Sequence, residues 1–200
     1  MPAAGTFSQD MAPPSGRGRL FILSAPSGAG KSTLGRYLRD RFKNIRYSVS
    51  TTTRAPRNGE SDGVDYHFTT RQRFEAGIRE NRWAEWAEVH GNYYGTSADF
   101  IDCCLGNGNN VLLDIDVQGT RQILARYPES VTIFILPPSI EVLQKRLTDR
   151  GTERPDVIAR RIQNAPGEMD QQGVYRHVLI NDDLEAAVAE LIGIMASYGV

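Results

Sequence analysis

Residues 21–38, "FILSAPSGAGKSTLGRYL", run from an apolar stretch through a glycine-rich turn into a helical pattern. A strand, such a turn with Lys and Ser, and a helix together form the context of a phosphate-binding loop, in which backbone N–H groups and the helix N-terminus hold an anion. The motif G-x-x-x-x-G-K-[ST] is complete except that Ala25 occupies the first glycine position. The segment therefore predicts a nucleoside triphosphate site between a strand and a helix.

Each part of this loop has an expected role. We expect Lys31 to reach the β- and γ-phosphates and Ser32 to offer its hydroxyl to Mg²⁺. Alanine is tolerated at position 25 if its φ angle is negative, which we therefore predict. The residues expected to contact ATP are Ala25, Pro26, Ser27, Gly28, Ala29, Gly30, Lys31, Ser32 and Thr33. The loop alone leaves the acceptor open among water, a protein, a sugar and a nucleotide.

Composition and charge exclude several function classes. The chain has 200 residues, 40% of them apolar, and a formal net charge of −1, so an anion site must be local and no bulk charge favours nucleic acid or a membrane. It has no apolar run of about eighteen residues and no apolar signal segment at its start, so we expect it in the cytoplasm. Cys103 and Cys104 are adjacent and too close for a relaxed disulfide.

The remaining pattern alternates short apolar runs with helical periodicity, which predicts an α/β fold with a parallel sheet and right-handed crossovers. Four runs are typical of strands buried on both faces: 20–24, 111–115, 131–136 and 177–180. Three segments place apolar residues on one helix face: Leu34, Leu38 and Phe42; Ile140, Leu143 and Leu147; and Leu184, Val188 and Leu191. Ser139 and either Asp182 or Asp183 are expected N-caps.

Three stretches interrupt that rhythm. Residues 1–18 are rich in Pro, Gly, Ala and Ser and are expected to form a flexible tail, in which Met11 is a second plausible start. Residues 45–96 carry Thr, Tyr, Gly and charge in short alternating runs, which indicates a partly β insertion. Residues 138–165 form a helical, arginine-rich excursion.

The insertion carries candidate groups for a second anion. Arg54 and Arg57 flank Pro56, and two guanidiniums presented together can hold one phosphate by bidentate hydrogen bonds. Two tyrosines, Tyr66 and Tyr94, offer phenolic donors at either end of the insertion, and Ser50 and Thr96 add hydroxyl groups. The carboxylate of Glu85 could accept two hydrogen bonds from N1–H and N2–H₂ of guanine, an edge that adenine lacks. Each group alone is commonplace, whereas the set favours a guanine nucleotide.

At these residues the chain resembles the guanylate kinases. The resemblance covers essentially residues 19–198 and rests on "SAPSGAGKST", "SVSTTTRAPRNGESDGVDYHF", "EWAEVHGNYYGTS", "LLDIDVQG", "RLTDRGTE" and "VLINDD". It implies Mg²⁺-dependent transfer of a phosphoryl group from ATP to GMP. It also implies the P-loop nucleoside monophosphate kinase fold: a parallel five-stranded core sheet flanked by helices, a mixed α/β GMP-binding subdomain and a helical lid.

The resemblance further implies boundaries within a single domain of residues 19–200. The core would comprise about 19–47, 97–137 and 167–200, the GMP-binding subdomain about 48–96, and the lid about 138–166. Because "NAPGEMDQQGVY" places Pro166 and Gly167 where the family usually continues a helix, we expect the lid helix to end early.

Residue roles also follow from the resemblance, by matching positions. The GMP phosphate would be held by Ser50, Arg54, Arg57, Tyr66 and Tyr94, while guanine would be recognised by Glu85 and Thr96, with Asp116 nearby. Asp114 or Asp116 would help Ser32 to organise Mg²⁺. The catalytic groups would be Lys31, Arg54 and three arginines of the lid, Arg146, Arg150 and Arg161.

Two alternatives stay open on the sequence. One is a kinase of the same fold with another phosphate acceptor, such as a ribose bisphosphate. The other is a catalytically inert guanylate-kinase-like interaction module, which the presence of Lys31, Ser32 and the arginines disfavours. A guanine-binding GTPase is disfavoured because no N-K-x-D motif occurs. The expected partners are ATP and GMP, without nucleic acid or membrane, and a homo-oligomer is compatible with the sequence.

Overall fold

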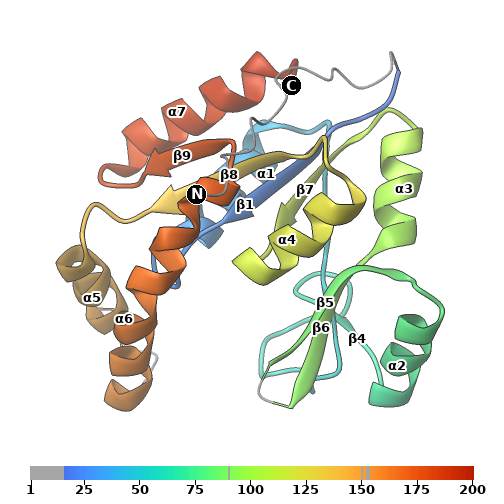
Figure 1. Cartoon of the computed structure of the whole chain (residues 1–200), viewed down its shortest axis with the longest axis horizontal. Coiled ribbons are helices and arrows are strands. Elements are labelled where there is room, and N and C mark those ends of the chain that lie inside the picture. Colours follow the sequence, from blue (N-terminus) through green and yellow to red (C-terminus); the bar gives the residue numbers. More distant parts are fainter. Residues whose placement is uncertain (1–15, 90, 150, 152–153) are drawn as a thin grey trace, which may run out of the picture.

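The computed structural model describes residues 16–89, 91–149, 151 and 154–200 (Figure 1). Most of the expected flexible tail, including Met11, lies outside the described residues. Arg150, expected in the lid, also lies outside them.

A parallel sheet forms the centre of the molecule, and its strand order in the described chain is β2-β7-β1-β8-β9. The strands are β1 Leu20–Ser24, β2 Ile45–Tyr47, β7 Asn110–Asp114, β8 Val131–Leu136 and β9 His177–Ile180. The four apolar runs are therefore strands, and the expected five-stranded parallel sheet is confirmed. β2 was not predicted as a strand because it is short and only Ile45 in it is buried.

Helices cover both faces of this sheet (Figure 1). Strand residues such as Phe21 and Leu23 pack with α1 and α7, whereas Leu20 and Ile22 pack with α3 and α4, so alternate side chains enter opposite cores. The helices are α1 Lys31–Arg41, α3 Ala98–Gly106, α4 Val117–Arg126 and α7 Leu184–Ser197. Asp183 is the N-cap of α7, because its carboxylate accepts a hydrogen bond from the Ala186 N–H.

The expectation that residues 177–180 are buried on both faces is wrong. Leu179 is fully buried, but the side chains of Val178 and Ile180 are 39% and 57% exposed. The reason is position: β9 is an edge strand, and α7 packs on the face that carries Leu179. An apolar run in sequence does not distinguish a central strand from an edge strand with one open face.

The insertion between β2 and α3 forms a second, smaller sheet with strand order β4-β3-β6-β5 and one helix, α2. Phe74 of α2 stacks on Trp83 and Tyr93 of the sheet, with ring centroids 4.2 and 5.1 Å apart. These aromatic contacts give the insertion a core of its own. Its elements are β3 Thr51–Thr52, β4 His67–Phe68, α2 Arg71–Arg79, β5 Trp83–Val89 and β6 Asn92–Ser97.

A pair of helices, α5 Ile140–Asp149 and α6 Pro155–Met169, forms the excursion between β8 and β9. They pack through Leu143, Leu147 and Ala165, and the Ser139 hydroxyl accepts a hydrogen bond from the Val142 N–H as an N-cap. In Figure 1 this pair and the insertion extend from the sheet as two separate projections.

The expectation that the lid helix ends near Pro166 is wrong. α6 continues through Pro166 to Met169 and passes directly into the 3₁₀ turn η1, Asp170–Val174. Pro166 lies on the exposed face of the helix. Water there can satisfy the one backbone carbonyl that loses its N–H partner, so the helix tolerates the proline.

Candidate active site

The glycine-rich loop between β1 and α1 depends on two glycines with left-handed backbone. Gly28 and Gly30 have φ angles of 94° and 101°, which side-chain-bearing residues rarely adopt. A Cβ at Gly28 would also lie 2.8 Å from Leu147 Cδ2, and one at Gly30 would collide with the Asn181 amide. Asn181 Nδ2 donates a hydrogen bond of 2.8 Å to the Ala29 carbonyl. The loop is therefore held from outside by a side chain that the motif does not include.

Ala25 fits the loop as predicted. Among the described non-glycine residues a positive φ occurs at Asn81, so the φ of Ala25 is negative. The first motif glycine is thus dispensable here, because alanine adopts a negative φ without strain.

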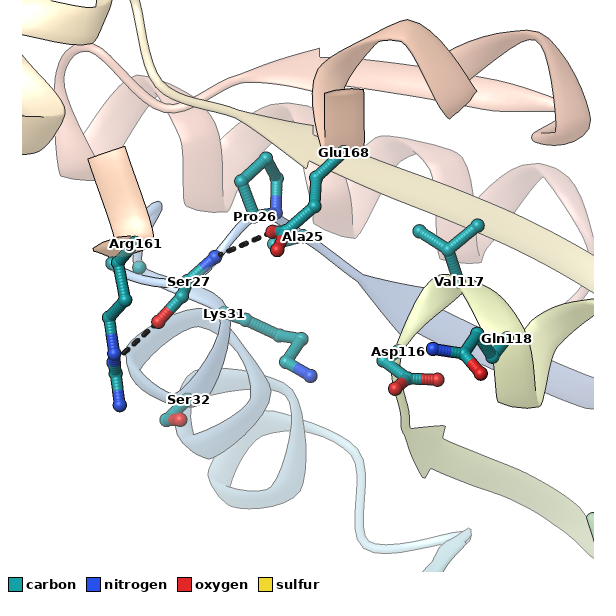
Figure 2. A pocket seen from close by; sticks show the side chains of 12 residues that line it. Ala25, Pro26, Ser27, Lys31, Ser32, Asp116, Val117, Gln118, Arg161 and Glu168 are labelled. Carbon is teal, nitrogen blue, oxygen red and sulfur yellow. Dashed lines mark hydrogen bonds between the residues drawn. The ribbon is translucent and has the colours of Figure 1, made fainter. Parts of the chain in front are cut away.

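The loop opens into a cavity of about 440 Å³ beneath α6 (Figure 2). Of the nine predicted ATP contacts, Ala29 is instead fully buried and Thr33 lines a neighbouring cavity. Three lining residues, Val117, Gln118 and Glu168, were not predicted. The full lining is Ala25, Pro26, Ser27, Gly28, Gly30, Lys31, Ser32, Asp116, Val117, Gln118, Arg161 and Glu168.

Helix α6 contacts the loop at Ser27 through two side chains (Figure 2). Arg161 Nη1 donates to the Ser27 hydroxyl at 2.5 Å, and the Ser27 backbone N–H donates to Glu168 Oε2 at 3.3 Å. Arg161 and Glu168 are seven residues apart and so lie on one face of the helix. The Glu168 carboxylate thus accepts a hydrogen bond from a backbone N–H of the loop that is predicted to bind an anion.

Lys31 points from the start of α1 toward the carboxyl end of β7. Its ammonium lies 2.6 Å from Asp114 Oδ1 and donates to the Ile115 carbonyl at 3.3 Å. In this arrangement the carboxylate and the carbonyl hold the lysine side chain across the mouth of the loop. A phosphate entering the loop would compete with them for the ammonium.

The oxygen donors beside the loop fit Mg²⁺. Ser32 and Asp116 line the loop cavity, and Asp114 lies next to Lys31. One hydroxyl and two carboxylates could therefore serve as ligands or bind water ligands of the ion. In the described residues no three His, Cys, Asp or Glu side chains group to hold a metal. Such a set suits an ion held by one or two protein oxygens together with substrate phosphates.

A second cavity of about 400 Å³ adjoins the first, because Lys31 and Asp116 line both. It brings together all but one of the residues predicted to bind GMP. The exception is Thr96, which is buried behind Glu85. The lining is Lys31, Ser50, Arg54, Arg57, Glu60, Tyr66, Glu85, Ala87, Val89, Tyr94, Asp114, Ile115 and Asp116.

One charged side chain of this cavity, Glu60, was not predicted, and neither were the apolar lining residues Ala87, Val89 and Ile115. Glu60 Oε1 forms an ion pair of 2.8 Å with Arg54 Nη2, and its Oε2 accepts the Arg57 backbone N–H at 2.8 Å. Arg54 also lies over the Tyr66 ring, 5.3 Å from its centroid. The hydrogen bond with Glu60 raises the pKa of Arg54, and Arg54 in turn lowers the pKa of Glu60. Glu60 therefore orients the first arginine and the loop that carries the second.

The same cavity is lined by Glu85, a buried residue that is 8% exposed. The Thr96 hydroxyl donates to Glu85 Oε1 at 2.6 Å. Burial, with a smaller contribution from the charge of Asp116, raises the pKa of Glu85 from 4.5 to about 7, and the hydrogen bonds from Thr96 only partly offset this. A buried acceptor without a cationic partner among the described side chains is suited to a ligand that brings hydrogen-bond donors.

Comparisons with known proteins agree with this geometry. Residues 17–198 match the family model for guanylate kinase. The guanylate kinase of Dechloromonas aromatica is 48% identical over 92% of this chain and 91% of its own length, and that of Shewanella violacea is 50% identical over 90% and 88%. A crystal structure of guanylate kinase from Anaplasma phagocytophilum superimposes with a TM-score of 0.73 at 33% identity, covering 91% of this chain and 86% of that one.

The chain belongs to the guanylate kinase family.

The three arginines predicted to belong to a lid differ in placement. Arg161 reaches the loop, as described above. Arg146 does not line the loop cavity; its Nη2 donates to the Asp182 carbonyl at 3.3 Å, and it borders a separate cavity with Gly28 and Thr33. Arg150 lies outside the described residues. No helix in the described part of the chain has the length and apolar character needed to span a membrane.

The stability of the protein without nucleotide should depend on pH through Glu85. The folded chain holds this proton more tightly than the unfolded chain, because the pKa rises from 4.5 to about 7. The stabilisation is therefore complete below pH 4.5 and is lost as the pH rises through 7. We expect Glu85→Gln to gain about 2 kcal/mol of unfolding free energy relative to wild type between pH 5 and pH 8. Urea unfolding without nucleotide measures this, and a pH-independent difference would contradict it.

Proposed function

We propose that this chain transfers the γ-phosphoryl group of ATP to a phosphate oxygen of GMP, giving ADP and GDP. The observation that carries the proposal is the pair of adjoining cavities that share Lys31 and Asp116, one built on a phosphate loop and the other containing two arginines and a buried carboxylate. Membership of the guanylate kinase family supports it.

In this proposal the loop cavity binds the donor. The N–H groups at the start of α1 and the Lys31 ammonium hold the terminal phosphates, and Arg161 lies at the edge of the same cavity. When Mg²⁺ is bound it neutralises phosphate charge, and Ser32 with Asp114 would hold it, directly or through water. Arg146, whose Nη1 is buried without a hydrogen-bond partner in the described structure, would have to turn to join them.

The neighbouring cavity binds the acceptor. Arg54 and Arg57, together with the hydroxyls of Ser50, Tyr66 and Tyr94, hold the GMP phosphate. Glu85 accepts hydrogen bonds from N1–H and N2–H₂ of guanine, and Thr96 orients its carboxylate from behind. Adenine presents no such pair of donors, so the same carboxylate would exclude AMP.

The reaction needs no side chain that removes a proton. A nucleotide phosphate has a second pKa of about 6, so the attacking oxygen is already ionised at neutral pH. Catalysis then depends on aligning two anions and neutralising their charge. Lys31, Arg54 and Arg161 can do this because each of them lines one or both of the adjoining cavities. Closure of the lid, helices α5 and α6, over the two cavities would exclude water as a competing acceptor.

The two alternatives raised by the sequence fit the structure less well. A ribose bisphosphate has no donor edge to occupy the buried Glu85 carboxylate. An inert interaction module would have no need for an intact loop that faces a completed second anion cavity. Phosphorus-31 NMR of a mixture of ATP, GMP and Mg²⁺ tests the reaction, because ADP and GDP must accumulate in equal amounts. The cytoplasmic location expected from the sequence stays a prediction.

The contact of Glu168 with the loop leads to a prediction for ATP binding. The γ-phosphate would meet the Glu168 carboxylate at the Ser27 N–H, so removing this negative charge should favour the donor. We expect Glu168→Gln to tighten binding of a non-hydrolysable ATP analogue about three- to tenfold in calorimetry, with GMP binding unchanged. Glu190→Gln, on the exposed face of α7, is the matched control. Weaker analogue binding in the Glu168 variant would show that the carboxylate supports the loop instead.

A further inference from the structure

Helix α4 contacts strand β5 beside Glu85, the residue proposed to recognise guanine. We propose that Gly119 and Gln122 of α4 are positioning residues that set the location of Glu85 and thereby the preference for guanine. The inference rests on the proposed role of Glu85 in binding guanine. It extends that role from the insertion to a helix of the core.

Gly119 leaves the space that Glu85 occupies. A Cβ at position 119 would lie 2.9 Å from Glu85 Oε2, 3.3 Å from its Cδ and 3.4 Å from Ile115 Cβ. Gly119 is buried in α4, and its φ angle is not positive, so the helix backbone gives no reason for glycine. Glycine inside a helix costs about 0.5–1 kcal/mol relative to alanine. The space for the carboxylate accounts for its presence.

The two oxygens of Glu85 are thus fixed by different parts of the molecule. Oε1 accepts a hydrogen bond from Thr96, which belongs to β6 of the insertion. Oε2 packs against Gly119, whose own N–H donates to Asp116 Oδ1 at 2.8 Å. Because Glu85 is a buried residue, its carboxyl group has little room to move elsewhere. Its position therefore depends on the core as well as on the insertion.

Gln122 fastens the same helix face to the strand that carries Glu85. Its Nε2 donates to the Trp86 carbonyl at 2.9 Å, and its Oε1 accepts the Trp86 N–H at 3.1 Å. β5 is an edge strand, so these bonds satisfy backbone groups that lack a neighbouring strand. Gly119 and Gln122 are three residues apart and share one face of α4. Gly119 allows Glu85 to approach α4 closely, and Gln122 fixes the position of β5 along the helix.

Gly119→Ala should therefore displace the carboxylate and leave the rest of the site intact. The added methyl group would move Glu85 Oε2, because the three atoms nearest to it belong to Glu85 and Ile115 rather than to the loop, Arg54 or Arg57. The test compares GMP with inosine monophosphate, which keeps N1–H but lacks the 2-amino group. A merely structural defect would lower activity with both nucleotides alike, whereas misplacement of Glu85 lowers the preference between them.

The experiment measures kcat/KM for both acceptors in wild type, Gly119→Ala, Gln122→Leu and Glu85→Gln. Gly193→Ala, a glycine inside α7 with open space around its Cβ position, is the matched control. We expect the GMP-to-inosine monophosphate ratio to fall at least tenfold in the Gly119 variant and about threefold or more in the Gln122 variant. The KM for ATP should stay within about twofold, and the Gly193 control should keep the wild-type ratio.

The variants separate failure of this inference from failure of the role proposed for Glu85. If Glu85→Gln abolishes the preference and both α4 variants retain it, the positioning role is overturned and the role of Glu85 stands. If Glu85→Gln retains the preference, both are overturned. Should Gly119→Ala not fold, the Gln122 variant decides alone, because it introduces no new contact with the carboxylate.

Discussion

Replacing Lys31 with alanine is expected to lower kcat for GMP phosphorylation by about 10³-fold while the chain stays folded. Lys31 lines both the loop cavity and the adjoining cavity proposed for GMP, and no other described Lys or Arg lines both. Preorganised charge at such a position typically contributes a factor of about 10²–10³ to the rate. The loss should appear in kcat measured at saturating ATP and GMP, rather than in KM alone.

The cost of this substitution to stability should be small. Lys31 pairs with Asp114, whose side chain is 16% exposed, so the variant leaves one partly hydrated carboxylate without its partner. We expect a loss of about 1–2 kcal/mol in unfolding free energy. Lys43→Ala, at an exposed lysine just beyond α1, serves as the control. Collapse of the folded state in the Lys31 variant, or turnover close to wild type, would contradict the assignment.

Glu85→Gln should have an effect of similar size, confined to the acceptor. Glutamine offers one oxygen and an NH₂ group, so at least one guanine donor would face another donor in a buried site. Sites that bind a substrate through hydrogen bonds reject mismatched partners by up to about 10⁴–10⁵-fold. We therefore expect kcat/KM for GMP to fall about 10³-fold, with the dissociation constant of ATP unchanged.

The matched control for this substitution is Glu88→Gln in the same strand. Glu88 is exposed and lies 3.5 Å from Arg71, away from the cavity lining, so its loss should leave GMP turnover near wild type. Equal losses in both variants would mean that the strand, rather than the carboxylate, was disturbed. Unchanged GMP turnover in the Glu85 variant would mean that guanine is recognised elsewhere.

Sequence patterns were sufficient where the physics is local. The strand, turn and helix around Lys31 follow from apolar runs and a glycine motif, and a negative φ at Ala25 follows from its place at a strand end. Arg54 and Arg57 lie three residues apart, so one loop presents both to the same cavity. Such predictions need only neighbouring residues and the conformations open to them.

Features that depend on distant partners were missed. Asn181 supports the loop across 152 positions of sequence, and Gly119 faces a carboxylate on another sheet, so neither leaves a local pattern. Arg146 shows the same limit, because its contact with the Asp182 carbonyl depends on how the lid packs. Glu60 is an intermediate case: its spacing after Arg57 could have indicated a turn that returns a carboxylate to the arginines.

The most direct test of the account is the initial rate of ADP formation from ATP with each acceptor in turn. GMP, AMP, CMP, UMP and a ribose bisphosphate would be supplied at equal concentration with Mg²⁺. The account predicts turnover with GMP at least 10³-fold above that with AMP, because a buried carboxylate accepts from guanine and finds no matching donors on adenine. Comparable rates with GMP and AMP, or faster turnover of the ribose bisphosphate, would contradict it.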